Sequence, residues 1–155
     1  MQHKRFKKYK RLIKLLNIYP PYLFSGIRVV DYNEDFTYFK VRLKLTWYNK
    51  NLVGTAFGGS LYSMCDPFFM FILLINLGES YIVWDKAASI NFVKPGKGTV
   101  YAEFFLSQEE IANVKSVVDQ EGKKVFTFPC KVVDKNGQLI ASLQKDVYVR
   151  RKEKI

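Results

Sequence analysis

The stretch from Gly58 to Asn76 most constrains the fold, because it is apolar on nearly all sides and Asp66 is its only charged residue. A helix that is apolar all round has to be enclosed by the rest of its domain. Pro67 lies inside the stretch. Because proline has no backbone N–H, we expect a kink beside Asp66 that leaves the Ser63 carbonyl without its usual donor. Gly78 suits the position just after the helix.

Alternating apolar and polar residues on both sides of this helix predict strands. The segment 39–47 alternates most regularly, and its apolar face runs from Phe39 to Trp47. A strand is also expected at 27–30, and four more follow the helix, at 81–93, 99–106, 124–133 and 139–150. Pro129 places its strand at an edge or at a bulge. An antiparallel sheet wrapped around the helix is the simplest way to bury it, so the expected class is α+β.

Short connections join these strands. Pro95-Gly96 and residues 134–137 are typical of turns. Residues 107–118 are expected to form a short helix or a loop, because Ser107 can cap a helix and Glu110 follows three residues later.

The first residues predict a basic amphipathic helix. Between residues 4 and 17, apolar residues recur at helical spacing with lysines and arginines between them, and Pro20-Pro21 should end the helix. We therefore divide the chain into a helix at 1–19 and a single domain at 20–155. A basic helix with an apolar stripe suits peripheral contact with an anionic membrane, although a solvated or subunit-packing helix explains the pattern equally well.

Charge and cysteine usage narrow the function classes. The net charge is +11, of which +8 lies before the first acidic residue, Asp31, so the excess is largely confined to one helix. No nucleic-acid motif accompanies it, and nucleic acid is not an expected partner. The basic start lacks the sustained apolar region of a secretory signal. Cys65 and Cys130 are too few for a disulfide framework and are expected to be buried thiols, which fits the cytoplasm.

Several familiar chemistries do not fit the chain. His3 is the only histidine, which argues against Ser-His-Asp and Cys-His catalysis. No cluster of His, Cys and carboxylates has the spacing of metal ligands, and no cofactor is expected. Residues 96–99 lack the preceding glycine of a phosphate-binding loop.

The segment before and within the apolar helix combines an amide, glycines and one carboxylate. Gly54, Gly58 and Gly59 permit a tight turn, and free N–H groups at the helix start would face a polarised carbonyl or an anion. Asp66, about two turns later, is a carboxylate that needs a partner or a function. Alternatively, Asn51 and the glycines only turn the chain, and Asp66 caps a helix that restarts at Pro67.

This set of residues, from Asn51 through Gly58-Gly59 to Asp66, resembles the signature of hotdog-fold acyl-CoA thioesterases of the phenylacetyl-CoA thioesterase-like group. Residues 85–96 are similar to the third strand of that group, and the order of elements fits from about 25 to 150. The resemblance implies an antiparallel sheet around one long central helix, here with an extra N-terminal helix. It is closest to a poorly characterised branch. Phe57, where many relatives have histidine, and Pro67 depart from the pattern.

The resemblance also implies roles for individual residues. Asp66 would act as general base or nucleophile, Asn51 would hold the water or the carbonyl, and the Gly58 N–H would bind the carbonyl oxygen. Asp85 matches a small polar residue on the third strand, and it would be a second base, an orienter of water, or half of a salt bridge with a neighbouring lysine. The implied substrate-binding residues are Phe57, Gly59, Asp85, Lys86 and Lys94.

The implied reaction is hydrolysis of an acyl-CoA or another acyl thioester. Lys86, Lys94 and Lys97 could meet the phosphates of coenzyme A, although solvated surface charge explains each of them as well. Hotdog relatives pair their sheets and build sites between subunits, so a homodimer or homotetramer is expected. Phe57 and Pro67 favour the alternative of a non-catalytic acyl-CoA or lipid-binding hotdog protein.

Overall fold

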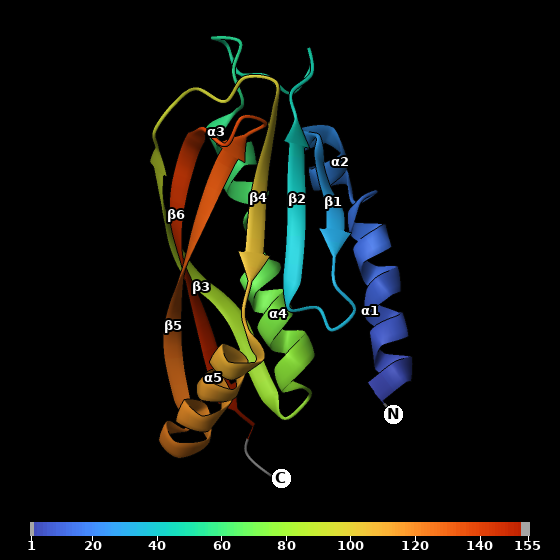
Figure 1. Ribbon diagram of the computed structural model, residues 1–155, viewed down its shortest axis with the longest axis vertical. Helices are drawn as coiled ribbons and strands as arrows, with labels where there is room; N and C mark the ends of the chain where they lie inside the picture. Colours follow the sequence, from blue (N-terminus) through green and yellow to red (C-terminus); the bar gives the residue numbers. More distant parts are fainter. Residues whose placement is uncertain (1, 153–155) are drawn as a thin grey trace.

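The computed structural model describes residues 2–152, and its side chains from residue 8 onward. Six strands form one antiparallel sheet in the order β1-β2-β4-β5-β6-β3 (Figure 1). The elements are α1 (Gln2–Leu16), α2 (Pro20–Ser25), β1 (Ile27–Tyr32), β2 (Tyr38–Lys44), α3 (Gly58–Ser63), α4 (Phe68–Leu77), β3 (Tyr81–Phe92), β4 (Thr99–Phe105), α5 (Gln108–Glu121), β5 (Lys123–Asp134) and β6 (Leu139–Arg151). The expected α+β class is confirmed.

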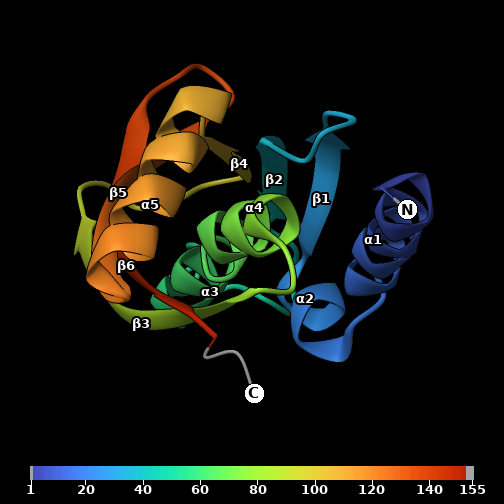
Figure 2. The same cartoon turned by 90° about the horizontal axis from the view of Figure 1, so that it is seen from below.

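The sheet curves around α3 and α4, which lie at the centre of the end-on view (Figure 2). On α4, Phe68, Phe69 and Ile72 are buried, and the ring of Phe68 stacks on Phe104 of β4 with centroids 4.8 Å apart. By length and composition alone, Gly58–Leu77 could cross a membrane. Its place inside the sheet is that of the core helix of a compact domain, as the apolar pattern predicts.

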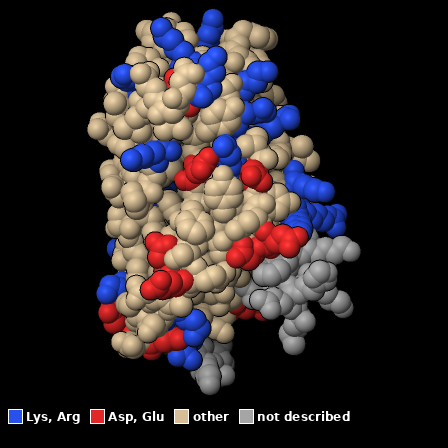
Figure 3. Space-filling model, viewed as in Figure 1, with Lys and Arg blue, Asp and Glu red and all other residues tan. Residues whose placement is uncertain are grey.

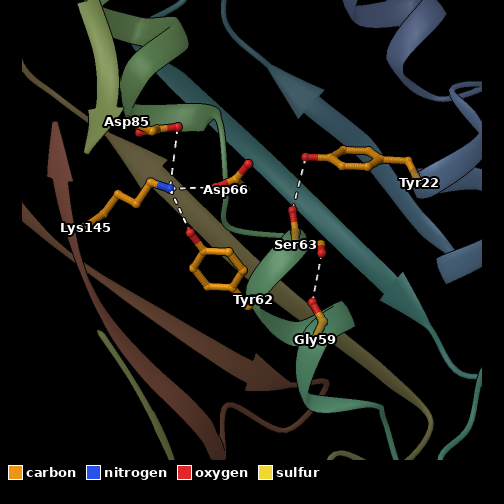
Figure 4. Close-up of polar contacts among 7 residues, drawn as sticks. All are labelled: Tyr22, Gly59, Tyr62, Ser63, Asp66, Asp85 and Lys145. Atoms are coloured by element: carbon orange, nitrogen blue, oxygen red, sulfur yellow. Dashed lines mark hydrogen bonds and ion pairs between the residues drawn. The ribbon is translucent and has the colours of Figure 1, made fainter. Parts of the chain in front are cut away.

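The predicted kink at Pro67 is a complete break in the core helix. α3 ends at Ser63 and α4 begins at Phe68. The Ser63 carbonyl accepts the Asp66 N–H at 3.2 Å and the hydroxyl of Tyr22, on α2, also at 3.2 Å (Figure 4). The phenol therefore supplies a donor where proline has none, and a partly buried carbonyl keeps its hydrogen bonds.

The strand prediction for 39–47 is right for the first part and wrong for Trp47. β2 ends at Lys44, and Trp47 lies in the following loop with 83% of its surface exposed. The Asn49 side chain explains the early end, because its Oδ1 accepts the Thr46 N–H at 2.7 Å and its Nδ2 donates to the Lys44 carbonyl at 2.9 Å. A local side-chain bond thus replaces the next step of the ladder.

The prolines act differently from one another. Pro20-Pro21 do not simply end the first helix but occupy the first turn of α2, a position where their missing N–H costs nothing. Pro129 lies in β5, whose ladder with β4 covers only residues 132–134, so the strand pairs with β6 alone at this point. The prediction that Pro129 marks an edge is confirmed.

Helices α1 and α5 each pack against the rest of the domain through one face. On α1, Ile13 is buried and Tyr9 lies against the ring of Phe36, whereas Leu12 and Leu15 are exposed. The side chains of residues 2–7 lie outside the described part, and they include His3 and Phe6, one of the apolar residues at helical spacing in the predicted basic helix. α5 begins with the reciprocal bonds between Ser107 and Glu110 expected from the sequence.

Candidate active site

Most of the predicted site residues fall into two clusters that line different pockets. Asp66, Asp85 and Lys86 line a pocket of about 410 Å³. Asn51, Gly58 and Lys94 line another of about 390 Å³ beside the loop between β3 and β4. The two pockets share no lining residue. Within one chain, the proposed base and the proposed carbonyl-binding groups are therefore separate.

Lys145 of β6 lies at the centre of the first cluster (Figure 4). It is 2% exposed, and its Nζ is 2.7 Å from Asp66 Oδ1, 3.4 Å from Asp85 Oδ2 and 3.4 Å from the Tyr62 hydroxyl. A buried ammonium is tolerated only when it is paired, and here two carboxylates pair with it. Burial would lower the pKa of Lys145, but the bond to Asp66 and the charge of Asp85 raise it above its usual value.

The sequence analysis did not single out Lys145, although the pattern of β6 indicates that it is buried. Along β6, Leu143, Lys145, Val147 and Val149 fall at every second position, and all four are buried. Residues two apart on a strand share a face, so the apolar neighbours already place Lys145 inward. A lysine among inward-facing residues requires an acidic partner.

A β-bulge on β3 accompanies Asp85. Asp85 pairs with Val147 and Ala87 pairs with Asp146, so Lys86 is the extra residue. Bulges next to active sites change the direction of neighbouring side chains. Here the Asp85 carboxyl points to Lys145 from the strand beside it (Figure 4).

The two carboxyls differ in solvation. Asp85 Oδ1 is buried without a hydrogen-bond partner among the described residues. Burial raises the pKa of Asp85 to about 6. The attraction of Lys145 opposes this rise, and the negative charge of Asp66 adds to it. The Asp66 side chain is 48% exposed, and within the described residues only its Oδ1 is hydrogen-bonded. Asp66 does not cap α4, because the N-cap is Pro67 and no side-chain cap bond forms. The capping alternative is therefore wrong for Asp66.

Asn51 organises the loop that precedes α3. Its Oδ1 accepts the N–H groups of Val53 and Thr55 at 3.1 and 2.9 Å, and its Nδ2 donates to Thr55 Oγ1 at 3.0 Å. Both ends of the amide are thus used within the loop, as the turn-forming alternative predicts.

Gly58 and Phe57 form the start of α3. Phe57 is the N-cap and makes no side-chain cap bond, and a Cβ on Gly58 would lie 3.0 Å from the ring of Phe92 on β3. Gly58 therefore permits close approach of the helix start to the strand. A Cβ on Gly59 would meet the Phe57 ring at 2.5 Å, so this glycine makes room for the phenylalanine rather than lining a pocket. The helix has only six residues, so an N–H here would act mainly as an individual donor.

The raised pKa of Asp85 predicts a pH-dependent stability. An unfolded aspartate titrates near 3.8 and the folded Asp85 near 6, so the folded state binds this proton more tightly. Stability should then fall as pH rises from about 4 to about 6, by about 1–2 kcal/mol after allowance for partial solvation. Asp85→Asn mimics the protonated carboxyl, so it should gain that much relative to the unsubstituted protein between pH 4 and pH 7. Urea denaturation measures the difference, and a constant difference would show that Asp85 does not titrate in this range.

Comparison with known proteins finds one matching family and several solved structures with a similar fold. A family described as Domain of unknown function (DUF4442) matches residues 10–149. A Pseudomonas aeruginosa protein of unknown function, named "Probable Thioesterase", has a TM-score of 0.74 at 20% identity, over 83% of this chain and 85% of that one. The E. coli PaaI protein, from the phenylacetic acid degradation operon, has a TM-score of 0.63 at 17% identity, over 98% and 96%. A Haemophilus influenzae thioesterase has a TM-score of 0.59 at 14% identity, over 83% and 80%.

No curated protein sequence matches the chain. The structural likeness identifies the architecture as the hotdog fold that the sequence predicts.

Proposed function

This chain belongs to the family Domain of unknown function (DUF4442), and we propose that it hydrolyses acyl thioesters, with acyl-CoA as the substrate class. One observation carries the proposal: Asp66 lies at the break of the core helix with Oδ1 bound by Lys145, and its half-exposed side chain lines a pocket. The names of structurally similar proteins as thioesterases agree with this chemistry.

In the proposed reaction, the free oxygen of Asp66 removes a proton from a water that attacks the thioester carbonyl. The C–S bond then breaks and the departing sulfur takes the proton held by Asp66, giving a carboxylic acid and a thiol and restoring the carboxylate. A direct attack by Asp66 on the carbonyl is the variant route. The N–H of Gly58 would stabilise the negative charge that develops on the carbonyl oxygen, which is typically worth about 3–4 kcal/mol per donor.

A second copy of the chain would complete this site. The Asp66 pocket and the Gly58 pocket are separate in one chain, and β3 is an edge of the sheet, with Trp84 and Phe92 on it and Val93 just after it exposed. Exposed apolar edge strands tend to pair. A homodimer, or a tetramer built from it, would cover this edge and bring Asp66 of one chain toward Gly58 of the other. Light scattering that gives the mass of one chain at micromolar concentration would contradict this part of the proposal.

Basic residues favour coenzyme A as the thiol carrier. Figure 3, viewed as Figure 1, shows Lys and Arg side chains gathered at the upper end of the molecule, where the loops 45–57 and 93–98 lie in Figure 1. Lys94 lines the Gly58 pocket and Lys86 lines the Asp66 pocket, and both could meet phosphate groups.

Steady-state hydrolysis of acyl-CoAs, from short to long and including aromatic acyl groups, tests the proposed reaction. The same acyl groups on a carrier protein form the comparison series. Turnover with at least one acyl-CoA is expected. If every thioester binds without turnover, the alternative of a non-catalytic acyl-CoA or lipid-binding protein replaces the proposal.

Phe57→His tests that alternative at the residue that favours it. Phe57 is 57% exposed and lines a pocket of about 550 Å³ with Leu52 and Val53. A histidine would add a donor beside the Gly58 N–H, and turnover should rise about tenfold if a polarising group is missing. Phe57→Leu is the matched control, because it keeps an apolar side chain without a donor and should not raise turnover. Weaker affinity of both variants for long acyl chains alone would instead assign Phe57 to acyl-chain binding.

The proposed location is the cytoplasm. There, α1 would contact anionic membranes. Within the part of α1 whose side chains are described, four basic residues are exposed, and Leu12 and Leu15 between or beside them are exposed too, although Ile13 packs inward. Each basic group near an anionic surface contributes about 1 kcal/mol. Vesicles rich in anionic lipid should sediment the protein at low salt, and absence of sedimentation would remove the membrane contact.

A further inference from the structure

The lengths of the two Lys145 ion pairs do not follow the need for charge neutralisation. The shorter contact, 2.7 Å, goes to Asp66, whose side chain is 48% exposed and can be solvated by water. The longer one, 3.4 Å, goes to Asp85, whose side chain is only 20% exposed. A lysine that served only to neutralise a buried carboxyl would be expected to make its shorter bond to Asp85.

The bond to Asp66 has a geometric effect that neutralisation does not require. Rotation of an aspartate carboxyl about its last side-chain bond is only weakly restricted. Lys145 reaches Oδ1 from β6, with Leu143 and Val147 buried on either side of it along the strand. A fixed ammonium on Oδ1 therefore sets the plane of the carboxylate and the direction of Oδ2.

We propose that Lys145 is a positioning residue that fixes the Asp66 carboxylate so that its free oxygen faces the pocket, while Asp85 holds Lys145 from the neighbouring strand. The inference rests on the proposed function, in which Asp66 Oδ2 takes the proton. Among the described residues, the titratable groups that face Lys145 are Asp66, Asp85 and Tyr62, and the Lys145 charge also acts on the neutral thiol of Cys65. Small errors in the placement of a reacting group can cost about 100-fold in rate.

Three variants separate positioning from neutralisation. Lys145→Met keeps most of the length of the side chain without its charge, and kcat should fall about 10- to 100-fold while KM stays within about twofold. Asp85→Asn removes the carboxylate that holds Lys145 but leaves the Asp66 bond in place, so kcat should fall by less than it does in Lys145→Met.

The double variant Lys145→Met/Asp85→Asn is the decisive case, because it removes one positive and one negative charge together and relieves the unpaired buried carboxylate. Its stability should recover relative to Lys145→Met, while its kcat should stay as low. Recovery of kcat along with stability would show that Lys145 only neutralises Asp85, and would overturn the inference.

A second measurement does not depend on activity. The Lys145 ammonium, being buried, should give a protected ¹H–¹⁵N NMR signal that Asp85→Asn preserves and that Asp66→Ala, which removes the acceptor, shifts strongly. An unchanged signal in Asp66→Ala would overturn the inference whatever the activity. If the unsubstituted protein hydrolyses no thioester, the proposed function fails and the NMR result alone decides whether Lys145 orients Asp66.

Discussion

Asp66→Asn should lower kcat for thioester hydrolysis by about 10²- to 10⁴-fold, the usual contribution of a general base, while the protein stays folded. The amide has nearly the shape of the carboxylate, and its oxygen can still accept the Lys145 hydrogen bond that Oδ1 now accepts. What it lacks is an anionic oxygen to take the proton or to attack. Because Asp66 does not cap α4, the substitution removes no helix cap.

Asp146→Asn provides the matched control for this result. Asp146 follows Lys145 on β6, so its side chain leaves the opposite face of the strand, and it accepts a bond from Thr127 at 2.6 Å. Turnover in this variant should equal that of the unsubstituted protein. Retained turnover in a folded Asp66→Asn protein would assign the base elsewhere, with Asp85 as the next candidate.

Gly26→Ala should destabilise the protein by about 3 kcal/mol or more, from two separate causes. Gly26 has φ +75°, which an alanine adopts only with strain, and a Cβ there would lie 2.5 Å from both the Lys44 carbonyl oxygen and Asn49 Nδ2. The carbonyl is backbone and cannot move away easily. Asn49 also holds the start of the loop that leads to Asn51, so the substitution should disturb the loop that lines the Gly58 pocket as well.

Gly54→Ala separates the two causes. Gly54 has φ +81°, but nothing lies within 4 Å of its Cβ position. Only the backbone strain remains, so the expected loss is about 1–2 kcal/mol. Urea denaturation of the two variants measures the difference. Equal losses would mean that the crowding at Gly26 relaxes without cost.

Much of the architecture could be predicted from periodicity. The enclosed helix, the strands around it and the cap at Ser107 follow from local patterns that persist in the fold. α2 was not predicted, because its six residues contain two prolines and show no helical period. The strand end before Trp47 was also missed, because a bond from Asn49 to the backbone outweighs the alternation of side chains.

The candidate site was predictable only in part. Asp66 and Asp85 were found as candidates, and the structure brings both to the same ammonium. Lys145 was missed, although the apolar residues at every second position of β6 show that its side chain faces inward. The bulge at Lys86 has no signature in one sequence, and without it the register that joins Asp85 to β6 could not be derived. The separation of Asn51 and Gly58 from Asp66 depends on how distant segments pack, which local patterns do not contain.

The hydrogen bond from Tyr22 to Ser63 ties the segment before the sheet to the turn that carries Asp66. Burial raises the pKa of Tyr22 above its usual range, so the phenol remains a donor at any physiological pH. Detachment of α2 would leave the Ser63 carbonyl with one donor fewer, at a cost of about 1–3 kcal/mol if it stays buried. The fraction of molecules with an ordered Asp66 turn is therefore linked to the docking of α2. A ligand or surface that engages this N-terminal region would change the site without touching it.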